Sequence, residues 1–138
     1  MCGIVGIYHK NKNVSGEIYD ALIQVHHRGQ DAAGIATWDK SKMSLHKELG
    51  VVTEVFKTSE SLSLEGNIGV GHVRYPTAGC SDASEAQPFY SANPVNISLA
   101  HNGTLTSGEQ IRASLLKTHF CQFNTQSDSE VLLNLFAY

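Results

Sequence analysis

The first ten residues, Met1 to Lys10, read MCGIVGIYHK and place a cysteine directly ahead of a short apolar stretch. Residues 2–8 are rich in isoleucine and valine, which predicts a buried first strand. If the initiator methionine is removed, Cys2 carries both a thiol and a free α-amine. In small peptides an α-amine titrates near about 7.7–8.0 and a thiol near about 8.5, so such an amine can accept the proton of its own thiol. A lone cysteine is more often a small buried hydrophobic residue, and the rest of the sequence must decide between the two interpretations.

Length and composition indicate one globular domain. The chain has 138 residues, of which 41% are hydrophobic and 17% charged, with a net charge of −3. Its Lys and Arg residues are scattered, which argues against a nucleic-acid-binding protein. No apolar stretch is long enough to cross a bilayer, and the N-terminus lacks the basic start of a signal peptide, so we expect a cytoplasmic protein that does not bind a membrane. The three cysteines are far apart and form no CxxC pair, which argues against a disulfide framework and against a zinc knuckle.

Hydrophobic patterns along the chain predict a mixed α and β protein without internal repeats. The predicted strands are 2–8, 32–39, 43–49, 67–73 and 96–103. The predicted helices are 15–27, with Ser15 as its N-cap, and two that begin at the capping boxes Thr106 to Glu109 and Ser127 to Glu130. In the strand 67–73 glycines occupy one face, which predicts the close approach of another layer.

Five motifs follow the N-terminal Cys-Gly-Ile in a fixed order. They are HHRGQDAAG (26–34), GHVRYPTAG (71–79), SEAQPF (84–89), LAHNGTL (99–105) and SDSE (127–130). Together they resemble class II (type 2) glutamine amidotransferase domains, which are N-terminal nucleophile hydrolases. RGQDAAG and RYPTAG are similar to the amidophosphoribosyltransferase branch rather than to the glucosamine-phosphate or asparagine synthetases.

The resemblance covers essentially all of residues 1–138 and implies an α+β fold, a four-layer αββα sandwich of antiparallel sheets. The glutaminase domain of this family is longer, so we expect residues 1–138 to be its N-terminal portion, with the sandwich incomplete at the C-terminus. Missing strands would leave sheet edges unpaired, and the chain alone is then expected to be unstable or to oligomerise.

The resemblance also assigns the reaction. Cys2 would attack the side-chain carboxamide of L-glutamine, and Asn102 with Gly103 would form the oxyanion hole. Each preorganised donor at a developing oxyanion contributes about 2.7–4 kcal/mol. An Asn-Gly pair after a strand is also a strong hairpin-turn signal, and the two interpretations are compatible because a tight turn can present both donors.

The substrate carries a carboxylate and an ammonium group, which require opposite charges. Arg74 is suited to the carboxylate because its guanidinium is a rigid fork, and Asp128 could accept the ammonium. The alternatives are a surface ion pair for Arg74 and a dipole-favoured acid at the first helical position for Asp128. In similar enzymes a loop closes over glutamine, which here would be 75–84 with Thr77 as a ligand contact.

Arg28 and Gly29 resemble residues that shape the pocket around the cysteine, and we expect them to support the site rather than to take part in the chemistry. The histidines at positions 26, 27, 72 and 101 raise the question of a metal or a Cys–His dyad. Because His26 and His27 are adjacent and point in different directions on a helix, packed histidines are the simpler interpretation and no metal site is expected.

The family's second domain is a phosphoribosyltransferase that uses the ammonia to make phosphoribosylamine, the first step of purine synthesis. Its paired-aspartate loop for phosphoribosyl pyrophosphate is absent here, so no cofactor is expected in this portion, and Mg with phosphoribosyl pyrophosphate belongs to that domain. The full-length enzyme is expected to be a homo-oligomer. Three alternatives remain open. The chain could be the glutaminase domain of another class II enzyme or an amidase for another amide. It could also be a truncated domain that binds glutamine or a partner without catalysis.

Overall fold

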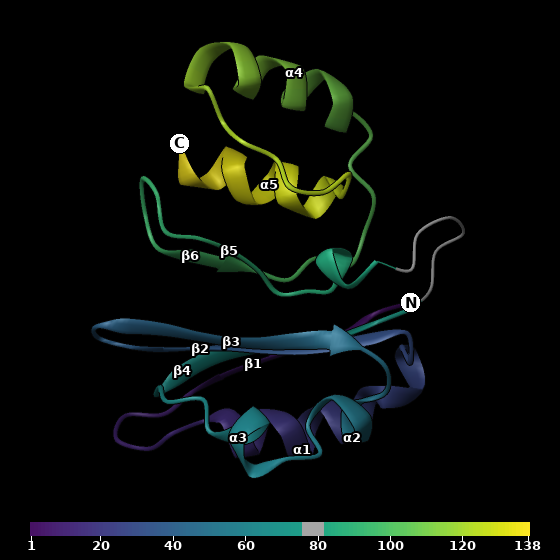
Figure 1. Cartoon of the computed structure of the whole chain (residues 1–138), viewed down its shortest axis with the longest axis vertical. Helices are drawn as coiled ribbons and strands as arrows, with labels where there is room; N and C mark the ends of the chain where they lie inside the picture. Colours follow the sequence, from purple (N-terminus) through teal and green to yellow (C-terminus); the bar gives the residue numbers. More distant parts are fainter. Residues whose placement is uncertain (76–81) are drawn as a thin grey trace.

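In a computed structural model, which describes residues 1–75 and 82–138, two antiparallel sheets lie face to face with helices on the outer side of each (Figure 1). The layers follow the order helix, sheet, sheet, helix, as the αββα prediction requires. The larger sheet has the strand order β1-β4-β2-β3, and the smaller sheet pairs β5 with β6. The predicted fold class is therefore confirmed.

The elements are short, and strands and helices are interspersed along the chain. The strands are β1 (Gly3–Tyr8), β2 (Ala32–Asp39), β3 (Lys42–Leu49), β4 (Ile68–Arg74), β5 (Phe89–Ser91) and β6 (Ile97–Leu99). The helices are α1 (Ser15–Val25), the 3₁₀ turn η1 (His26–Arg28), α2 (Val52–Val55), α3 (Ser59–Leu62), the 3₁₀ turn η2 (Ala83–Glu85), α4 (Gly108–His119) and α5 (Asp128–Ala137).

Helix α1 packs directly on the glycines of β4. A Cβ atom on Gly71 would lie 2.5 Å from Cγ2 of Ile18, and one on Gly69 would lie 2.7 Å from Cδ1 of the same side chain. Both distances are shorter than carbon atoms tolerate, so larger residues would push the helix away from the sheet. The predicted close approach of another layer at this strand is confirmed.

Two of the three predicted helix caps are wrong. Helix α1 has Val14 at its N-cap position, and the Ser15 hydroxyl instead donates to the carbonyl of Leu62 at 3.0 Å. Helix α4 begins after Ser107 with no side-chain cap, so Thr106 does not form the predicted box. Ser127 does cap α5, because its hydroxyl accepts the amide proton of Ser129 at 3.2 Å.

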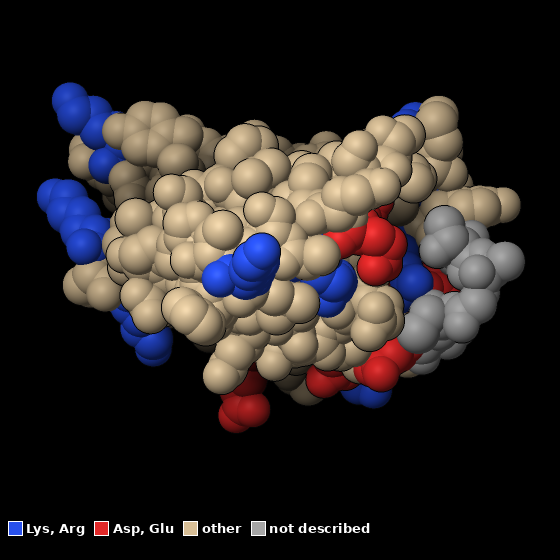
Figure 2. All heavy atoms as spheres, turned by 90° about the horizontal axis from the view of Figure 1, so that it is seen from above, with Lys and Arg blue, Asp and Glu red and all other residues tan. Residues whose placement is uncertain are grey.

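The smaller sheet is a short hairpin covered by α5, with α4 outside α5 (Figure 1). Strand β6 ends at Leu99, earlier than the predicted strand 96–103, because the chain leaves the sheet to form the turn that holds the HNG motif. Seen from above, this half presents a largely neutral face with dispersed Lys and Arg side chains (Figure 2). Within 1–75 and 82–138, no helix has the length and apolar character needed to cross a membrane.

Candidate active site at the N-terminal cysteine

A cavity of about 660 Å³ opens where β1 begins and β4 ends. These two strands are antiparallel neighbours with Gly3 paired to Val73, so their register brings the residue before β1 next to the last residue of β4. The cavity is lined by five of the predicted site residues, Cys2, Arg74, Asn102, Gly103 and Asp128. Residues separated by up to 126 positions thus meet at one opening.

Cys2 is half-buried, and its sulfur accepts the backbone N–H of Tyr75 at 3.5 Å. Its carbonyl oxygen accepts two further hydrogen bonds, from Nε of Arg28 at 3.0 Å and from Nδ2 of Asn102 at 3.3 Å. Arg28 therefore fixes the backbone of the cysteine without lining the cavity. The side-chain amide of Asn102 therefore lies beside Cys2.

Gly29 follows η1 at a point where the chain passes against the end of β4. A Cβ atom here would lie 2.4 Å from the carbonyl carbon of Arg74, so no larger residue fits without a backbone shift. Two residues further on, the amide of Asp31 donates to the carbonyl of Arg74 at 3.1 Å. The RGQD segment therefore sets the position of the last residue of β4.

Arg74 is 8% exposed, and its Nε lies 3.6 Å from Oδ2 of Asp31. It is a buried residue of the cavity wall rather than the surface ion pair considered as an alternative. Asp31 was missed as a site residue by the sequence analysis, although it belongs to the RGQDAAG motif. A half-buried carboxylate at this distance orients the guanidinium and balances its charge.

The position of Asp128 is compatible with both of the roles that the sequence analysis considered. It is the first residue of α5, and its Oδ2 accepts the backbone N–H of Leu105 at 2.7 Å. Its Oδ1 lies 3.8 Å from Nδ1 of His101, and the side chain faces the same cavity as Cys2. Thr77, the remaining predicted contact, lies outside the described residues.

Of the four histidines considered, His101 lines the cavity with Cys2, whereas His26, His27 and His72 are not among its lining residues. His72 of β4 is fully buried, and burial lowers its pKa to about 4, with the nearby charges of Arg74 and His101 adding to the effect. It is therefore neutral at physiological pH. In the two described ranges no three His, Cys, Asp or Glu side chains are grouped so that they could hold a metal ion.

The sequence analysis also missed Glu85, Gln87 and Ser129, which line the cavity. Each lies in a motif that was recognised, SEAQPF or SDSE, but no chemical role distinguished it there. Gln87 and Ser129 are hydrogen-bonded to each other at 3.1 Å, across 42 positions of sequence. Such a contact leaves no local signal in the chain.

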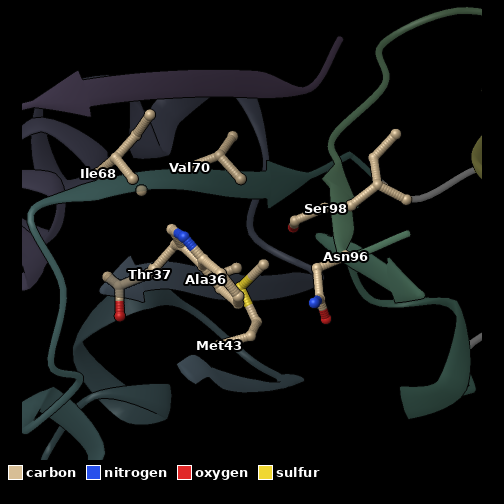
Figure 3. Close-up of a pocket in the computed structure, with 10 residues that line it drawn as sticks. Ala36, Thr37, Met43, Ile68, Val70, Asn96 and Ser98 are labelled. Carbon is tan, nitrogen blue, oxygen red and sulfur yellow. The ribbon is translucent and has the colours of Figure 1, made fainter. Parts of the chain in front are cut away.

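A second cavity of about 370 Å³ lies between the two sheets (Figure 3). Its wall includes Met43, Ile68, Val70, Asn96 and Ser98, and none of its lining side chains is ionisable. It therefore offers no counter-charge for an amino acid and no thiol. The cavity at Cys2 is the better candidate for chemistry.

Comparisons with known proteins identify the family of this chain. Residues 57–138 match the family described as glutamine amidotransferase domain. The chain is 53% identical over 138 residues to the amidophosphoribosyltransferase of Pseudomonas aeruginosa and 54% identical to that of Escherichia coli K12. The alignments cover 100% and 99% of this chain but 27% of each relative, so the chain spans about a quarter of their length.

Solved structures show the same architecture. Glutamine phosphoribosylpyrophosphate amidotransferase from Bacillus subtilis, complexed with ADP and GMP, superposes with a TM-score of 0.81 at 35% identity, covering 98% of this chain and 29% of that one. A structure described as the allosteric regulatory enzyme of purine biosynthesis gives 0.82 at 36%, with the same coverage. With a cysteine, an arginine and an Asn-Gly turn meeting at one cavity of this fold, the chain belongs to the glutamine amidotransferase domain family.

Proposed function

We propose that residues 1–138 form the N-terminal portion of a type 2 glutamine amidotransferase domain that hydrolyses L-glutamine to glutamate and ammonia, with Cys2 as the nucleophile after removal of Met1. One observation carries the proposal. A single cavity is lined by Cys2, Arg74, Asn102, Gly103 and Asp128. A thiol, two proposed oxyanion donors and two opposite charges therefore face one space in which an amino acid can bind.

The two charges bind the amino-acid end of the substrate. Arg74, oriented by Asp31, pairs with the α-carboxylate, and Asp128 accepts the α-ammonium. The side-chain carboxamide then extends toward Cys2. In this proposal Thr77 adds a contact to the ligand, while Arg28 and Gly29 hold the cysteine and the arginine in place.

The reaction begins with a proton transfer. The α-amine of the processed Cys2 takes the thiol proton, and the thiolate attacks the carboxamide carbon, so that a C–S bond forms and the carbonyl electron pair moves to oxygen. Nδ2 of Asn102 and the backbone N–H of Gly103 donate to this oxyanion. The 3.3 Å contact between Nδ2 of Asn102 and the carbonyl oxygen of Cys2 supports this role, because it holds the amide beside the nucleophile.

Collapse of the tetrahedral intermediate releases ammonia. The ammonium of Cys2 returns its proton to the leaving nitrogen, the C–N bond breaks, and a γ-glutamyl thioester remains. Water, deprotonated by the same amine, then attacks the thioester carbon. The C–S bond breaks, glutamate leaves, and the sulfur recovers its proton.

The relatives support a larger context for this activity. We propose that the ammonia passes to a phosphoribosyltransferase domain of the same full-length enzyme, which makes 5-phosphoribosylamine in the first step of de novo purine synthesis. That domain, and not residues 1–138, would bind Mg with phosphoribosyl pyrophosphate. We further propose that the full-length enzyme is a homo-oligomer and that it is cytoplasmic.

The test is the intact mass of the purified protein before and after treatment with a glutamine-like diazo-ketone. We expect a mass lower by one methionine, and then a single adduct that maps to Cys2 and is lost in the Cys2→Ser variant. Ammonia release from glutamine, but not from a panel of other amides, should accompany it. A processed protein that labels and hydrolyses another amide faster would indicate a different amidase, and one that retains Met1 and forms no adduct would contradict catalysis.

A further inference from the structure

We infer that Gln87 is a positioning residue for the oxyanion hole, because its side-chain amide holds the turn that presents Asn102 and Gly103 and fixes that turn to both sheets. The consequence for catalysis rests on the proposed glutaminase function. The placement itself depends only on the contacts of Gln87.

Both ends of the Gln87 side chain are hydrogen-bonded, and the residue is 8% exposed. Its Oε1 accepts the backbone N–H of His101 at 2.7 Å, and its Nε2 donates to Oγ of Ser129 at 3.1 Å. A backbone N–H can only donate, so the oxygen must face His101 and the orientation of the amide is determined. His101 directly precedes Asn102, and Gln87 therefore acts at the first residue of the turn.

The turn is held at two points. Gln87 binds its start at His101, and Oδ2 of Asp128 binds its end at the amide of Leu105. Asn102 and Gly103 lie between these points with exposed side chains and backbone. One anchor on each side fixes the backbone of the turn, and the two exposed residues between the anchors line the cavity.

Gln87 itself is fixed to the larger sheet. A Cβ atom on Gly34 of β2 would lie 2.2 Å from the carbonyl oxygen of Gln87, so the segment lies against the strand backbone. Lys47 of β3 donates from Nζ to the carbonyl of Ala86, and its Nζ lies 4.5 Å from the ring centroid of Phe89. Because Cys2 directly precedes β1 of the same sheet, Gln87 links the oxyanion turn to the sheet next to which the proposed nucleophile lies.

The experiment compares Gln87→Met, which keeps the length of the side chain, with Gln87→Glu, which keeps an acceptor for His101. We expect Gln87→Met to lower kcat for glutamine about tenfold to a hundredfold, with KM changed less than about twofold. Alkylation of Cys2 by iodoacetamide should keep its rate, because this displacement develops no oxyanion. Gln87→Glu should recover most of kcat.

The matched control is Asn134→Leu, which also removes a buried side-chain amide. Asn134 lies in α5, and its amide donates to the carbonyl of Glu130. We expect it to leave kcat unchanged. A fall of kcat, 1/KM and alkylation rate by the same factor in Gln87→Met would indicate general disruption and overturn the inference. An unchanged kcat in that variant would overturn it as well.

Amide hydrogen exchange separates this inference from the proposed function. If the wild-type chain releases no ammonia, the glutaminase proposal fails, but exchange at His101, Asn102 and Gly103 still reports the position of the turn. We expect faster exchange at these amides in Gln87→Met than in the wild type or Gln87→Glu. Equal exchange in all three proteins would contradict a positioning role.

Discussion

The two sheets of this molecule differ in the size of the core that supports them. Ten buried apolar residues form the cluster between the larger sheet and its helices, whereas the cluster of α4 and α5 has three, Leu115, Cys121 and Val131. Since buried apolar area is the main favourable term in folding, the larger sheet with α1 must provide most of the stability. The half with the smaller sheet depends on side-chain hydrogen bonds to a greater degree.

The candidate site divides its parts between these two halves. Arg74 ends β4 of the larger sheet and Cys2 directly precedes β1, whereas Asn102, Gly103 and Asp128 belong to the half with the smaller core. The proposed nucleophile and carboxylate-binding group therefore rest on the larger core, whereas the proposed oxyanion donors and ammonium acceptor rest on the smaller core and on side-chain hydrogen bonds. Chemistry should be more sensitive than the fold to changes in the second half.

The largest expected effect is the loss of catalysis on substitution of Cys2, which lies in the half with the larger sheet, without a loss of stability. Cys2→Ser should lower kcat for glutamine by more than about 10³-fold, since a hydroxyl is a much weaker acid than a thiol and its anion is not formed by an α-amine. The free energy of unfolding measured in urea should change by less than about 0.5 kcal/mol, because the Cys2 side chain is not part of the core. Ammonia release and urea melts on the same preparation check both numbers, and residual activity within tenfold of the wild type would exclude Cys2 as the nucleophile.

The next effect tests the comparison of the cores directly. Ile18→Ala should cost about 4 kcal/mol of unfolding free energy, because Ile18 is fully buried on the glycines of β4. Leu115→Ala should cost about 2 kcal/mol, since its cluster is small and close to the surface. Leu116→Ala, at an exposed position of the same helix, is the control. Equal losses at Ile18 and Leu115 would mean that the two halves share one core.

Acid should weaken the molecule through His72, which lies in β4 between the two halves. Burial lowers its folded pKa to about 4 from 6.5, so the unfolded chain binds the extra proton between these values and stability falls as pH falls through this window. The loss attributable to this residue between pH 7 and pH 4 is about 3 kcal/mol. Urea unfolding of wild type and His72→Leu at both pH values measures it, and identical slopes for the two proteins would assign the acid effect to other groups.

Sequence reasoning reached the site residues because each carries a recognisable chemistry within a motif. The roles of Cys2, Arg74 and Asn102 were predicted from the family resemblance of their motifs, and the structure brings the three residues to one cavity. The glycines of β4 predicted the packing of α1. The residues that hold them were not predictable. Asp31, Gln87 and Ser129 act through contacts between segments that are distant in the chain, and their local patterns do not distinguish them from ordinary polar residues.

The elements that escaped prediction are the shortest. Strand β5 has three residues and helices α2 and α3 have four, so each pattern runs for hardly more than one period and does not repeat. The capping-box signature at Thr106 failed for a related reason. It identifies residues that can cap, but whether they do depends on backbone angles set by the turn before α4.

The smallest expected effect concerns the hydrogen bonds that replace core packing in the weaker half. Glu130 was predicted to complete a capping box with Ser127, yet its carboxylate accepts the backbone amides of Asn124 and Thr125, both at 2.8 Å, and the Thr125 hydroxyl at 2.7 Å. In Glu130→Gln one of these donors faces an NH₂ group, and we expect a loss of about 1–2 kcal/mol. Because this loop precedes Asp128, exchange of amides in α5 should increase while those of β2 and β4 stay protected. Uniform acceleration across both sheets would show that the two halves unfold together.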